Sequence, residues 1–395
     1  AAKQGCKLII TLDCGIRAVD RVLDAAQLGI DVIICDHHLP GPVMPAAHTI
    51  LNPKQPHCPY PFKELSGCGV AFKLTQALTD RFGLSPMSAY DGLDLVALSI
   101  ASDLVAVTDE NRILLHHGLR TISRNARPGI KALLKVVRCD PDFLTVRDII
   151  SRVSPRINAA GRMARATEAV NLLTASNEAQ ANELALNLDR LNNVRRSYDE
   201  QVTQAAIQQL EERDEFKHVN IVWGKDWHRG VIGIVATRLI EHRYRPSIVI
   251  SDDDGVMVGS ARSTTGLDIH ALIKECGEHL LQFGGHAMAA GITVKPGAAL
   301  AFAQQLDDAV GREMQAASKR EPRHFDLEIN VAQCTPDLML QLRQFEPFGP
   351  GSPAPVFLAR DVALAYPPKK VGKDGRHIRV SIKTMAGSRA LDAVG

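Results

Sequence analysis

Hydrophobic residues near the start of the chain follow first a strand pattern and then a helical one. Residues 7–13 (KLIITLD) are a β-branched apolar run that ends in a carboxylate, and residues 31–36 (DVIICD) form a second such run. Between them, residues 17–28 space their apolar side chains as an amphipathic helix does. A strand, a helix and a strand within about 30 residues predict a βαβ unit, and therefore a parallel sheet covered by helices.

Longer helical patterns follow, and then the α/β pattern returns. Residues 66–150 show helical periodicity, and residues 168–217 contain no glycine or proline, which predicts one long connecting helix or two helices in sequence. From residue 218 onward, the strand patterns HVNIVWG, SIVIS and VMVGSARS accompany the helical pattern HRGVIGIVATRLIEHR. A helix near 268–276, the segment FGGHAMAAG and a helix near 298–316 complete this region.

The last part of the chain predicts β-structure. FDLEINV, FGPGSPAPVFLAR and HIRVSIKT are strand-like segments separated by proline and glycine turns, and we expect them to begin a small β-barrel. The sequence starts at Ala1 rather than Met and ends at Gly395 inside this region. We therefore expect both ends to be cuts from a longer protein.

Composition narrows the class of protein only slightly. The chain has 395 residues, 45% hydrophobic and 23% charged, which allows two or three cores. No run approaches the roughly 18 apolar residues of a membrane helix, so we expect no membrane association. The net charge of +2 requires any nucleic-acid surface to be a local patch. Cys14 and Cys35 lie in apolar runs, as expected for buried, reduced thiols of a cytoplasmic protein.

Acidic residues and histidines follow both predicted parallel strands. Asp13 ends the first strand, and Asp36, His37 and His38 end the second, at the edge where α/β sheets bind ligands. An Asp in this place is often only a turn residue or a helix N-cap. Two acidic strand ends with adjacent histidines instead favour a divalent ion such as Mn²⁺, which accepts both oxygen and nitrogen ligands.

A third carboxylate, Asp103, lies in the apolar segment LDLVALSIASDLVAV. If it is buried, it must be paired or bound to a metal. The alternative is that Asp103 ends a helix at the surface.

Basic residues occur in three further segments. Arg156, Asn158 and Arg162 lie in a stretch with four arginines and no acid, which suits phosphate contacts but also a solvated helix start. Ser260 and Arg262 end a predicted strand. The third segment is the C-terminal basic run, which consists of Lys369, Lys370, Lys373, Arg376, Arg379 and Lys383 beside the aromatic residues Phe357 and Tyr366. It suits either a track for a single strand or a solvated surface.

These motifs together resemble a known family. The triplet Asp-His-His at 36–38, with Asp-Cys-Gly at 13–15 upstream and SDLVAVTDENR downstream, resembles the DHH phosphoesterases. SPRINAAGRM at 154–163, GSARS at 259–263 and FGGHAMAAG at 283–291 resemble the RecJ exonucleases in particular. The motifs stand in family order along essentially the whole chain.

The resemblance implies an α/β fold class: two α/β domains joined by a long helix and followed by a β-rich, OB-like domain. The expected boundaries are 1–165 for a truncated DHH catalytic domain, 166–217 for the connecting helix, 218–322 for a DHH-associated substrate-binding domain and 323–395 for a truncated OB-like nucleic-acid-binding domain. The expected activity is metal-dependent hydrolysis of single-stranded DNA in the 5′-to-3′ direction, in DNA repair and recombination.

The resemblance also implies residue roles. Asp13, His37 and Asp103 would be metal ligands in a two-metal site for Mn²⁺ or Mg²⁺, which suits phosphodiester hydrolysis. Asp36 would orient the histidine, and His38 would lie close to the scissile phosphate. The substrate-binding set would be Arg156, Asn158, Arg162, Ser260, Arg262, Gly285 and His286, in which Ser260 and Arg262 hold the 5′-phosphate. Gly285 and His286 in GGH are, by themselves, more typical of a tight turn.

One family motif is absent from this sequence. An Asp-rich first motif supplies further metal ligands in the family, and the chain begins after that point. We therefore expect an incomplete metal site and little or no activity from the chain alone. The expected partners are single-stranded DNA, a single-stranded-DNA-binding protein and recombination helicases, with the protein a monomer.

Other functions fit the sequence less well. A DHH-type nanoRNase or nucleotide bisphosphate phosphatase would not need the long helix or the β-rich region. A non-catalytic scaffold would not need the acidic residues and histidines of the motifs, although the absent first motif leaves it open. A dinucleotide-binding oxidoreductase is excluded because no GxGxxG follows the first strand.

Overall fold

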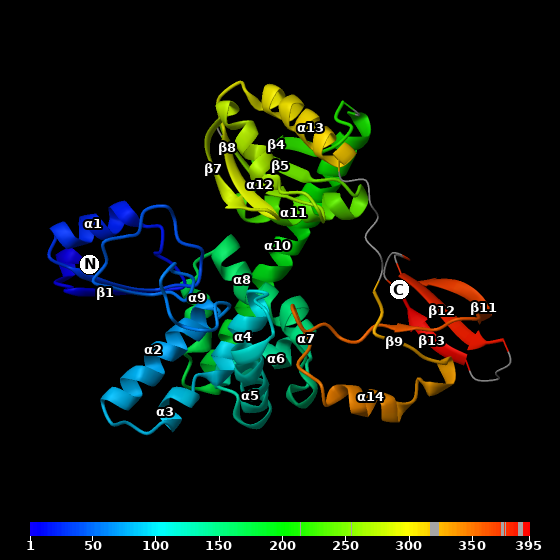
Figure 1. Cartoon of the computed structure of the whole chain (residues 1–395), viewed down its shortest axis with the longest axis horizontal. Helices are drawn as coiled ribbons and strands as arrows, with labels where there is room; N and C mark the ends of the chain where they lie inside the picture. The colour runs from blue at the N-terminus through cyan, green and yellow to red at the C-terminus, as the bar shows by residue number, and fades with distance from the viewer. Residues whose placement is uncertain (214, 254, 317–323, 373–374, 376, 386–389) are drawn as a thin grey trace. The chain divides into compact units, whose positions relative to one another are not determined.

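The structure, a computed structural model, describes residues 1–395 except 214, 254, 317–323, 373–374, 376 and 386–389. The chain divides into two units: unit 1 comprises residues 1–154 and 322–395, and unit 2 comprises residues 155–321. Figure 1 labels most of their helices and strands. Among the described residues, no helix combines the length and the apolar character that a membrane span requires.

Unit 1 begins with a parallel sheet. Its strands are β1 (Leu8–Leu12), β2 (Asp31–Cys35) and β3 (Thr49–Leu51), paired in that order. The crossover helix α1 (Val19–Gln27) buries Val22 and Ala25 in a core with Ile34 of β2. The predicted βαβ unit is therefore present, and β3, which the sequence pattern did not indicate, extends it.

The two cysteines of these strands differ in exposure. Cys35 is the last residue of β2 and is buried, as expected, whereas Cys14 is exposed. The prediction that Cys14 is buried is wrong because this residue lies beyond the end of β1, in the turn at the open edge of the sheet.

Helices make up most of the chain between residues 66 and 163. They are α2 (Gly67–Arg81), α3 (Met87–Tyr90), α4 (Leu93–Ser102), α5 (Asp109–Asn125), α6 (Pro128–Val137), α7 (Val146–Asp148) and, after a π-helical turn, α8 (Ser154–Met163). Most of α4 is buried, which explains why its sequence LDLVALSIAS has no wide polar face.

The C-terminal part of unit 1 is rich in β-structure, as predicted. Its elements are β9 (Leu327–Glu328), α14 (Pro336–Arg343), β10 (Phe357–Leu358), β11 (Val362–Val371), β12 (His377–Thr384) and β13 (Ala390–Val394). The last three strands form an antiparallel meander, and β9 pairs with β10 in parallel. Of the segment FGPGSPAPVFLAR, only Phe357–Leu358 is a strand, because its prolines cannot donate ladder hydrogen bonds.

Unit 2 is a sheet with helices on both faces. Its elements are α9 (Thr167–Leu173), α10 (Glu178–Glu212), β4 (Asn220–Lys225), α11 (Arg229–His242), β5 (Ser247–Asp253), β6 (Val256–Arg262), α12 (Ile269–Glu275), β7 (Leu280–His286), β8 (Ala289–Val294) and α13 (Ala299–Ala316). The strand order is β4-β5-β6-β8-β7, with only the first pair parallel. Of the two patterns considered for residues 168–217, two successive helices is the one observed, because Asn177 caps the start of α10.

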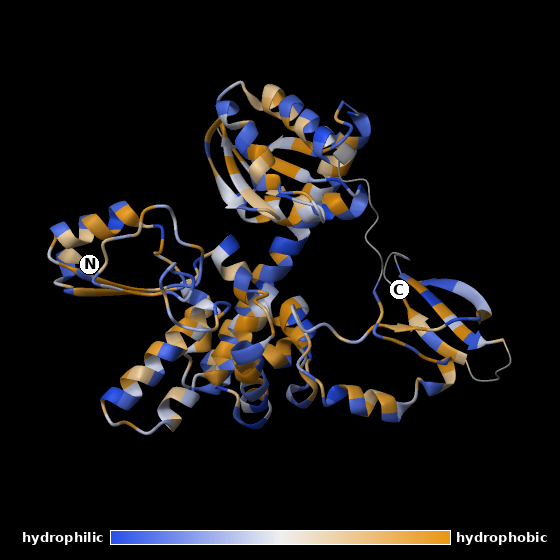
Figure 2. Cartoon of the chain, viewed as in Figure 1, coloured by the Kyte–Doolittle hydropathy of each residue, from blue (hydrophilic) through white to orange (hydrophobic). Residues whose placement is uncertain are grey.

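Two cores hold the helices of unit 2 in place. Val202, Ala206 and Leu210 of α10 pack with α11 on one face of the sheet. Phe302 and Leu306 of α13 pack with α12 on the other face. Figure 2 shows the apolar strands lying between helices whose outer faces are more hydrophilic.

Candidate functional site

The carboxyl edge of the parallel sheet in unit 1 collects polar residues from all three strands. Leu12, Cys35 and Leu51 are aligned in register, so the residues that follow them, Asp13, Asp36 and Asn52, emerge at the same edge. Asp13 adopts a left-handed backbone with φ of 63°. Asp103, directly after α4, is added to this edge by packing of the helices. We refer to Asp13, Asp36, His37, His38 and Asp103 as the carboxylate site.

Asp36 is the buried support of the carboxylate site. It is 1% exposed, and its Oδ2 accepts the backbone N–H of Ile16 at 3.0 Å. Its Oδ1 accepts the backbone N–H groups of His37 and His38 and lies 2.7 Å from His38 Nδ1. Burial by itself raises the pKa of Asp36, but these hydrogen bonds outweigh it and the net pKa is lowered. Asp36 was expected to orient His37, but the ring that it contacts is that of His38.

His37 directs one nitrogen at two carboxylates. Its Nε2 lies 3.1 Å from Asp13 Oδ1 and 3.3 Å from Asp103 Oδ2, and the side chain is almost fully buried. The Asp13 carboxylate raises the pKa of His37; burial opposes this, and the charge of Asp103 adds to it. Partial burial raises the pKa of the Asp103 carboxyl as well; the charge of His37 opposes this, and the charge of Asp13 adds to it. The three residues predicted as metal ligands therefore meet at one point.

The donor set of this site fits a divalent ion. The ligand atoms of Asp13, His37 and His38 lie within 4.8 Å of one another, and Asp103 faces the same His37 nitrogen. Neither buried ring nitrogen of His37 has a well-formed hydrogen bond in the part of the chain that the structure describes. A buried polar atom without a partner is costly, and a cation between the imidazole and the carboxylates would satisfy it.

Sequence reasoning missed Gly67, which makes room for Asp13. A Cβ atom on Gly67, the first residue of α2, would lie 2.1 Å from Asp13 Oδ1. Ser66 caps this helix and accepts the N–H of Gly69. The available signal was a glycine directly after a helix cap, where alanine would form a better helix.

Asn52 was missed for a different reason. It is 2% exposed, and its Nδ2 donates to the carbonyl oxygen of His38 at 2.9 Å while its Oδ1 accepts the N–H of Lys54. It thereby holds the backbone that carries the histidines. The short strand HTIL before Asn52 was the signal that could have revealed this residue.

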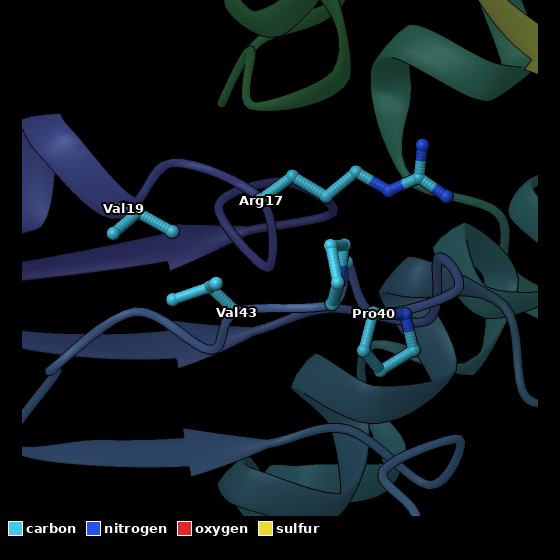
Figure 3. A pocket seen from close by; sticks show the side chains of 6 residues that line it. Arg17, Val19, Pro40 and Val43 are labelled. Carbon is cyan, nitrogen blue, oxygen red and sulfur yellow. The ribbon is translucent and has the colours of Figure 1, made fainter.

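A pocket of about 380 Å³ adjoins the turns that follow β1 and β2. Figure 3 shows the Arg17 side chain extending away from Val19 and Val43, which also line the pocket. Arg17 Nε donates to the carbonyl oxygen of Leu39 at 2.9 Å. Arg17 therefore fastens the turn after β1 to the segment that follows His38.

Unit 2 contains a cluster of opposite charge, the arginine site, which consists of Arg162, Arg195, Arg238 and Arg262. Arg262, at the end of β6, donates from Nη1 to Ser260 Oγ at 2.9 Å, and Arg162 donates to the carbonyl oxygen of Gly230 at 2.8 Å. A Cβ atom on Gly233 of α11 would lie 2.7 Å from Arg262 Nη2, so glycine lets the guanidinium rest on the helix. Burial, and then the charge of Arg162, lower the pKa of Arg262.

The arginine site has one buried carboxylate. Asp199 of α10 is fully buried and accepts from Arg238 Nη2 at 2.7 Å. Arg195 Nε is buried without a hydrogen-bond partner among the described residues. Burial lowers the pKa of Arg195, Asp199 opposes this, and Arg162 adds to the lowering. An anion is the ligand that such an excess of guanidinium groups would bind.

Gly285 and His286 share one end of the sheet with Arg262. Arg262 pairs with Ala289 of β8, which pairs with His286 of β7, so the three lie in one row across the sheet. Neighbouring strands are about 4.8 Å apart, which places the Cα atoms of Arg262 and His286 about 10 Å apart. A Cβ atom on Gly285 would lie 2.2 Å from the Ala289 carbonyl oxygen, so this glycine is required by the β7–β8 pairing itself.

The predicted absence of counter-charges around α8 is wrong for two arginines. Arg156 Nε lies 3.0 Å from Asp189 Oδ1 of α10, and Arg152 Nη1 lies 3.4 Å from Asp148 Oδ1. The sequence concealed the first pair because its partners are 33 positions apart. Asn158 is exposed on α8. The substrate-binding roles of Arg156 and Asn158 remain predictions.

The C-terminal basic run lies mainly on two strands. Lys369 of β11 is paired in register with Arg379 of β12, and Lys383 lies further along β12. Arg379 donates to the exposed Asp392 of β13, which neutralises part of this surface. Lys373 and Arg376 lie outside the described residues.

Three family models match the chain in succession. The DHH family N-terminal domain matches residues 3–100, the DHHA1 domain matches residues 203–312, and the RecJ OB domain matches residues 325–395. These matches confirm the resemblance inferred from the motifs.

Similar proteins cover the chain from end to end. A single-stranded-DNA-specific exonuclease RecJ from Bacillus subtilis is 37% identical over 395 residues, and the match covers 100% of this chain and 49% of that protein. The protein of the same name from Dickeya dadantii is 36% identical over 413 residues, with 100% of this chain and 71% of that protein covered. The chain therefore spans between about half and about 71% of these relatives.

A solved structure shares the fold. The crystal structure of RecJ in complex with Mn²⁺ from Thermus thermophilus matches with a TM-score of 0.81 at 28% identity, over 98% of this chain and 58% of that one. The expected fold class, two α/β regions with a long helix and a β-rich OB region, is thereby confirmed. By its sequence and its fold, the chain belongs to the RecJ family of DHH proteins.

Proposed function

We propose that this chain is the nuclease portion of a divalent-metal-dependent exonuclease that hydrolyses single-stranded DNA in the 5′-to-3′ direction. One observation carries the proposal: His37 Nε2 faces the carboxylates of Asp13 and Asp103 at the carboxyl edge of a parallel sheet. Relatives named as single-stranded-DNA-specific exonucleases, and a relative solved with Mn²⁺, support it.

Asp13, His37 and Asp103 would hold the ion, which would be Mn²⁺ or Mg²⁺, since the Thermus thermophilus protein was also solved with Mg²⁺. A bound divalent ion supplies Lewis-acid stabilisation of charge on phosphate oxygens and activates water. Asp36 keeps its acceptors occupied by backbone N–H groups and by His38 Nδ1, which leaves His38 Nε2 directed elsewhere. We assign His38 Nε2 to the scissile phosphate.

The arginine site would bind the 5′-terminal phosphate of the strand. Arg262 is oriented by Ser260, carries no carboxylate partner among its described contacts and lies near Arg162. His286 and Gly285 stand at the same end of the sheet. Recognition of a terminal phosphate at this site would define the 5′-to-3′ direction, since only one end of a strand carries that group.

The remaining expectations belong to the same proposal. The domain boundaries at 165, 217 and 322, the role in DNA repair and recombination, the cytoplasmic location and the monomeric state stay predictions. So do the partners, a single-stranded-DNA-binding protein and recombination helicases. The OB match over residues 325–395 supports single-stranded DNA as the substrate.

The decisive experiment replaces Asp13. Its side chain is 59% exposed, so Asp13→Ala should leave the fold intact while Mn²⁺ binding and exonuclease turnover in the full-length protein are lost. Asp24→Ala on α1, where the side chain is 57% exposed, is the matched control and should change neither. Unchanged cleavage of 5′-phosphorylated single strands by Asp13→Ala would refute the proposal.

The same assay separates the alternative functions. A nanoRNase or a bisphosphate phosphatase would prefer dinucleotides or nucleotide bisphosphates to long single strands. A strand of about 20 nucleotides is long enough for this comparison, because it exceeds the length that one OB fold binds. Faster turnover of the short substrates would indicate a nanoRNase or a bisphosphate phosphatase instead of an exonuclease. Absence of Mn²⁺ binding in the unaltered full-length protein would favour the scaffold.

A further inference from the structure

The segment Phe345–Ser352, which connects α14 to β10, lies on the loop between α4 and α5. Arg112, on the first turn of α5, grips this segment through three uncharged acceptors. Its Nη1 donates to the Pro347 carbonyl oxygen at 2.8 Å and to Ser352 Oγ at 3.0 Å, and its Nη2 donates to the Phe345 carbonyl oxygen. The Val107 N–H donates to the Pro350 carbonyl oxygen at 2.6 Å. These contacts span more than 230 positions of sequence.

Two glycines allow the segment to approach the loop this closely. A Cβ atom on Gly349 would lie 2.6 Å from Val107 Cγ2, and Val107 is fully buried, so it has little room to move. Gly351 has a φ of 75°, and a Cβ atom there would lie 3.1 Å from Thr108 Cγ2. Gly349 and Ser352 also exchange two backbone hydrogen bonds, which closes the segment into a tight turn. The surface of this turn is therefore shaped to the loop beneath it.

The loop under the segment begins with a residue of the carboxylate site. Asp103 is its first residue, Leu104 has a left-handed φ of 56°, and Asp109, the first residue of α5, has one of 44°. Such conformations are unfavourable for residues other than glycine and persist only where surrounding contacts impose them. Asn111 supplies one such contact by donating to the carbonyl oxygens of Ala106 and Glu64. The Phe345–Ser352 segment supplies the contacts at Val107.

We propose that the Phe345–Ser352 segment is a clamp that positions Asp103 for metal binding. The clamp fixes Val107 and Thr108, and the short, strained path from there back to Leu104 transmits this constraint to the Asp103 carboxylate. Arg112 and Gly349 are thus positioning residues, and neither touches the ion or the substrate. The metal-binding role of Asp103 rests on the function proposed above.

The clamp gives the C-terminal region a second task. Its β-strands are expected to contact DNA. The Phe345–Ser352 segment, which precedes most of these strands, would set the geometry of the carboxylate site. A separate contact, Arg343 of α14 over the ring of Phe143 at 4.8 Å, attaches α14 to the helices without reaching the Asp103 loop. Loss of that contact should therefore leave Asp103 undisturbed, which provides an internal control.

The test measures the loop and the ion separately, in the full-length protein. In Arg112→Ala, hydrogen exchange in the peptide 103–111 should accelerate, and the Kd for Mn²⁺, measured by electron paramagnetic resonance, should rise about tenfold, the lower range for loss of a group that orients a ligand. Arg112→Lys, which retains the charge but only one donor centre, should fall between. Arg343→Ala and Arg360→Ala, which break contacts elsewhere in the C-terminal region, should resemble the unaltered chain.

A compensating pair guards against simple unfolding. Gly349→Ala should reproduce the effect of Arg112→Ala, and adding Val107→Ala, which removes the methyl group that the new Cβ would meet, should restore slow exchange and Mn²⁺ affinity in large part. Unchanged exchange of 103–111 in Arg112→Ala would overturn the clamp. Faster exchange with unchanged Mn²⁺ affinity would overturn its action on Asp103. If the unaltered full-length protein binds no Mn²⁺, the proposed metal site fails, and the exchange data still decide whether the clamp exists.

Discussion

Unit 1 gathers carboxylates around one buried histidine, whereas unit 2 gathers arginines around one buried carboxylate. The field in the carboxylate site raises the pKa of His37, in which Asp13 has the largest effect. In the arginine site, burial and then the charge of Arg162 lower the pKa of Arg262. Each site therefore holds like charges close together in the fold.

Each site carries a charge opposite to that of the ligand that it would bind. Like charges held together repel, so a fold keeps them only where other contacts compensate. In unit 1 the compensation is a set of backbone N–H groups around Asp36, and in unit 2 it is Asp199. A cation would relieve the first repulsion and an anion the second.

The largest effect should come from removing the support of the carboxylate site. Asp36→Ala leaves the buried N–H groups of Ile16 and His37 without acceptors, at about 1–3 kcal/mol each, so the free energy of unfolding should fall by about 2–6 kcal/mol. Asp13→Ala, at an exposed position, should change it by no more than about 0.5 kcal/mol. Urea denaturation of both variants measures the difference. Equal destabilisation would contradict the distinction between support and ligand.

The next effect should appear in the arginine site. A hydrogen bond to a charged group contributes about 1.5–3 kcal/mol, so Arg262→Ala should reduce the preference for 5′-phosphorylated over 5′-hydroxyl single strands by roughly ten- to a hundred-fold. Binding of the two oligonucleotides is compared by fluorescence anisotropy. Arg229→Ala, an exposed arginine paired with Asp253, is the control and should retain the preference. Equal loss of affinity for both strands would mean that Arg262 does not read the terminal phosphate.

A smaller effect should follow from crowding Asp13. Gly67→Ala places a methyl group 2.1 Å from the present position of Asp13 Oδ1, so the carboxylate must move and Mn²⁺ affinity should fall about tenfold. Gly69→Ala, two residues further along α2, meets its nearest atom at 3.4 Å and is the matched control. Calorimetric titration of both variants with Mn²⁺ measures the contrast. A similar loss in Gly69→Ala would indicate damage to the helix rather than to the site.

The smallest effect should be seen where the charged side chain is exposed on the surface. Lys369 lies on an exposed strand of the C-terminal basic run, opposite Arg379. Lys369→Ala should weaken binding to all single strands alike. The slope of log K against log salt, which is negative, should become shallower by about 0.7. Anisotropy titrations at salt concentrations from about 50 to about 200 mM measure this slope. A change confined to 5′-phosphorylated strands would mean that Lys369 recognises the terminal phosphate, which is the role proposed for the arginine site.

Much of the carboxylate site could be predicted because local sequence fixes it. The runs KLIITLD and DVIICD, with a helix between them, require parallel strands, and parallel strands bring Asp13 and Asp36 to the same edge. His37 and His38 then follow by chain connectivity. The long helix and the β-rich end were predictable for the same reason, since periodicity and the absence of glycine and proline act over neighbouring residues.

Other features depended on which distant segments pack together. Arg156 was expected to lack a counter-charge, but Asp189 reaches it from another helix. Nothing near Gly67 in the sequence reveals that Asp13 occupies the space where its side chain would be. The same holds for the Phe345–Ser352 clamp, whose partner Arg112 lies more than 230 positions earlier.

The sequence by itself thus determined most of the helices and strands, their order and the chemistry at the ends of two strands, because each follows from spacing within a few residues. Only the tertiary structure decided that Asp103 faces His37, that Arg262 lies beside Arg162, and that Asp36 bonds the ring of His38 rather than that of His37. The physical reason is that burial and charge pairing are set by contacts across space. Such contacts carry no periodic signal along the chain.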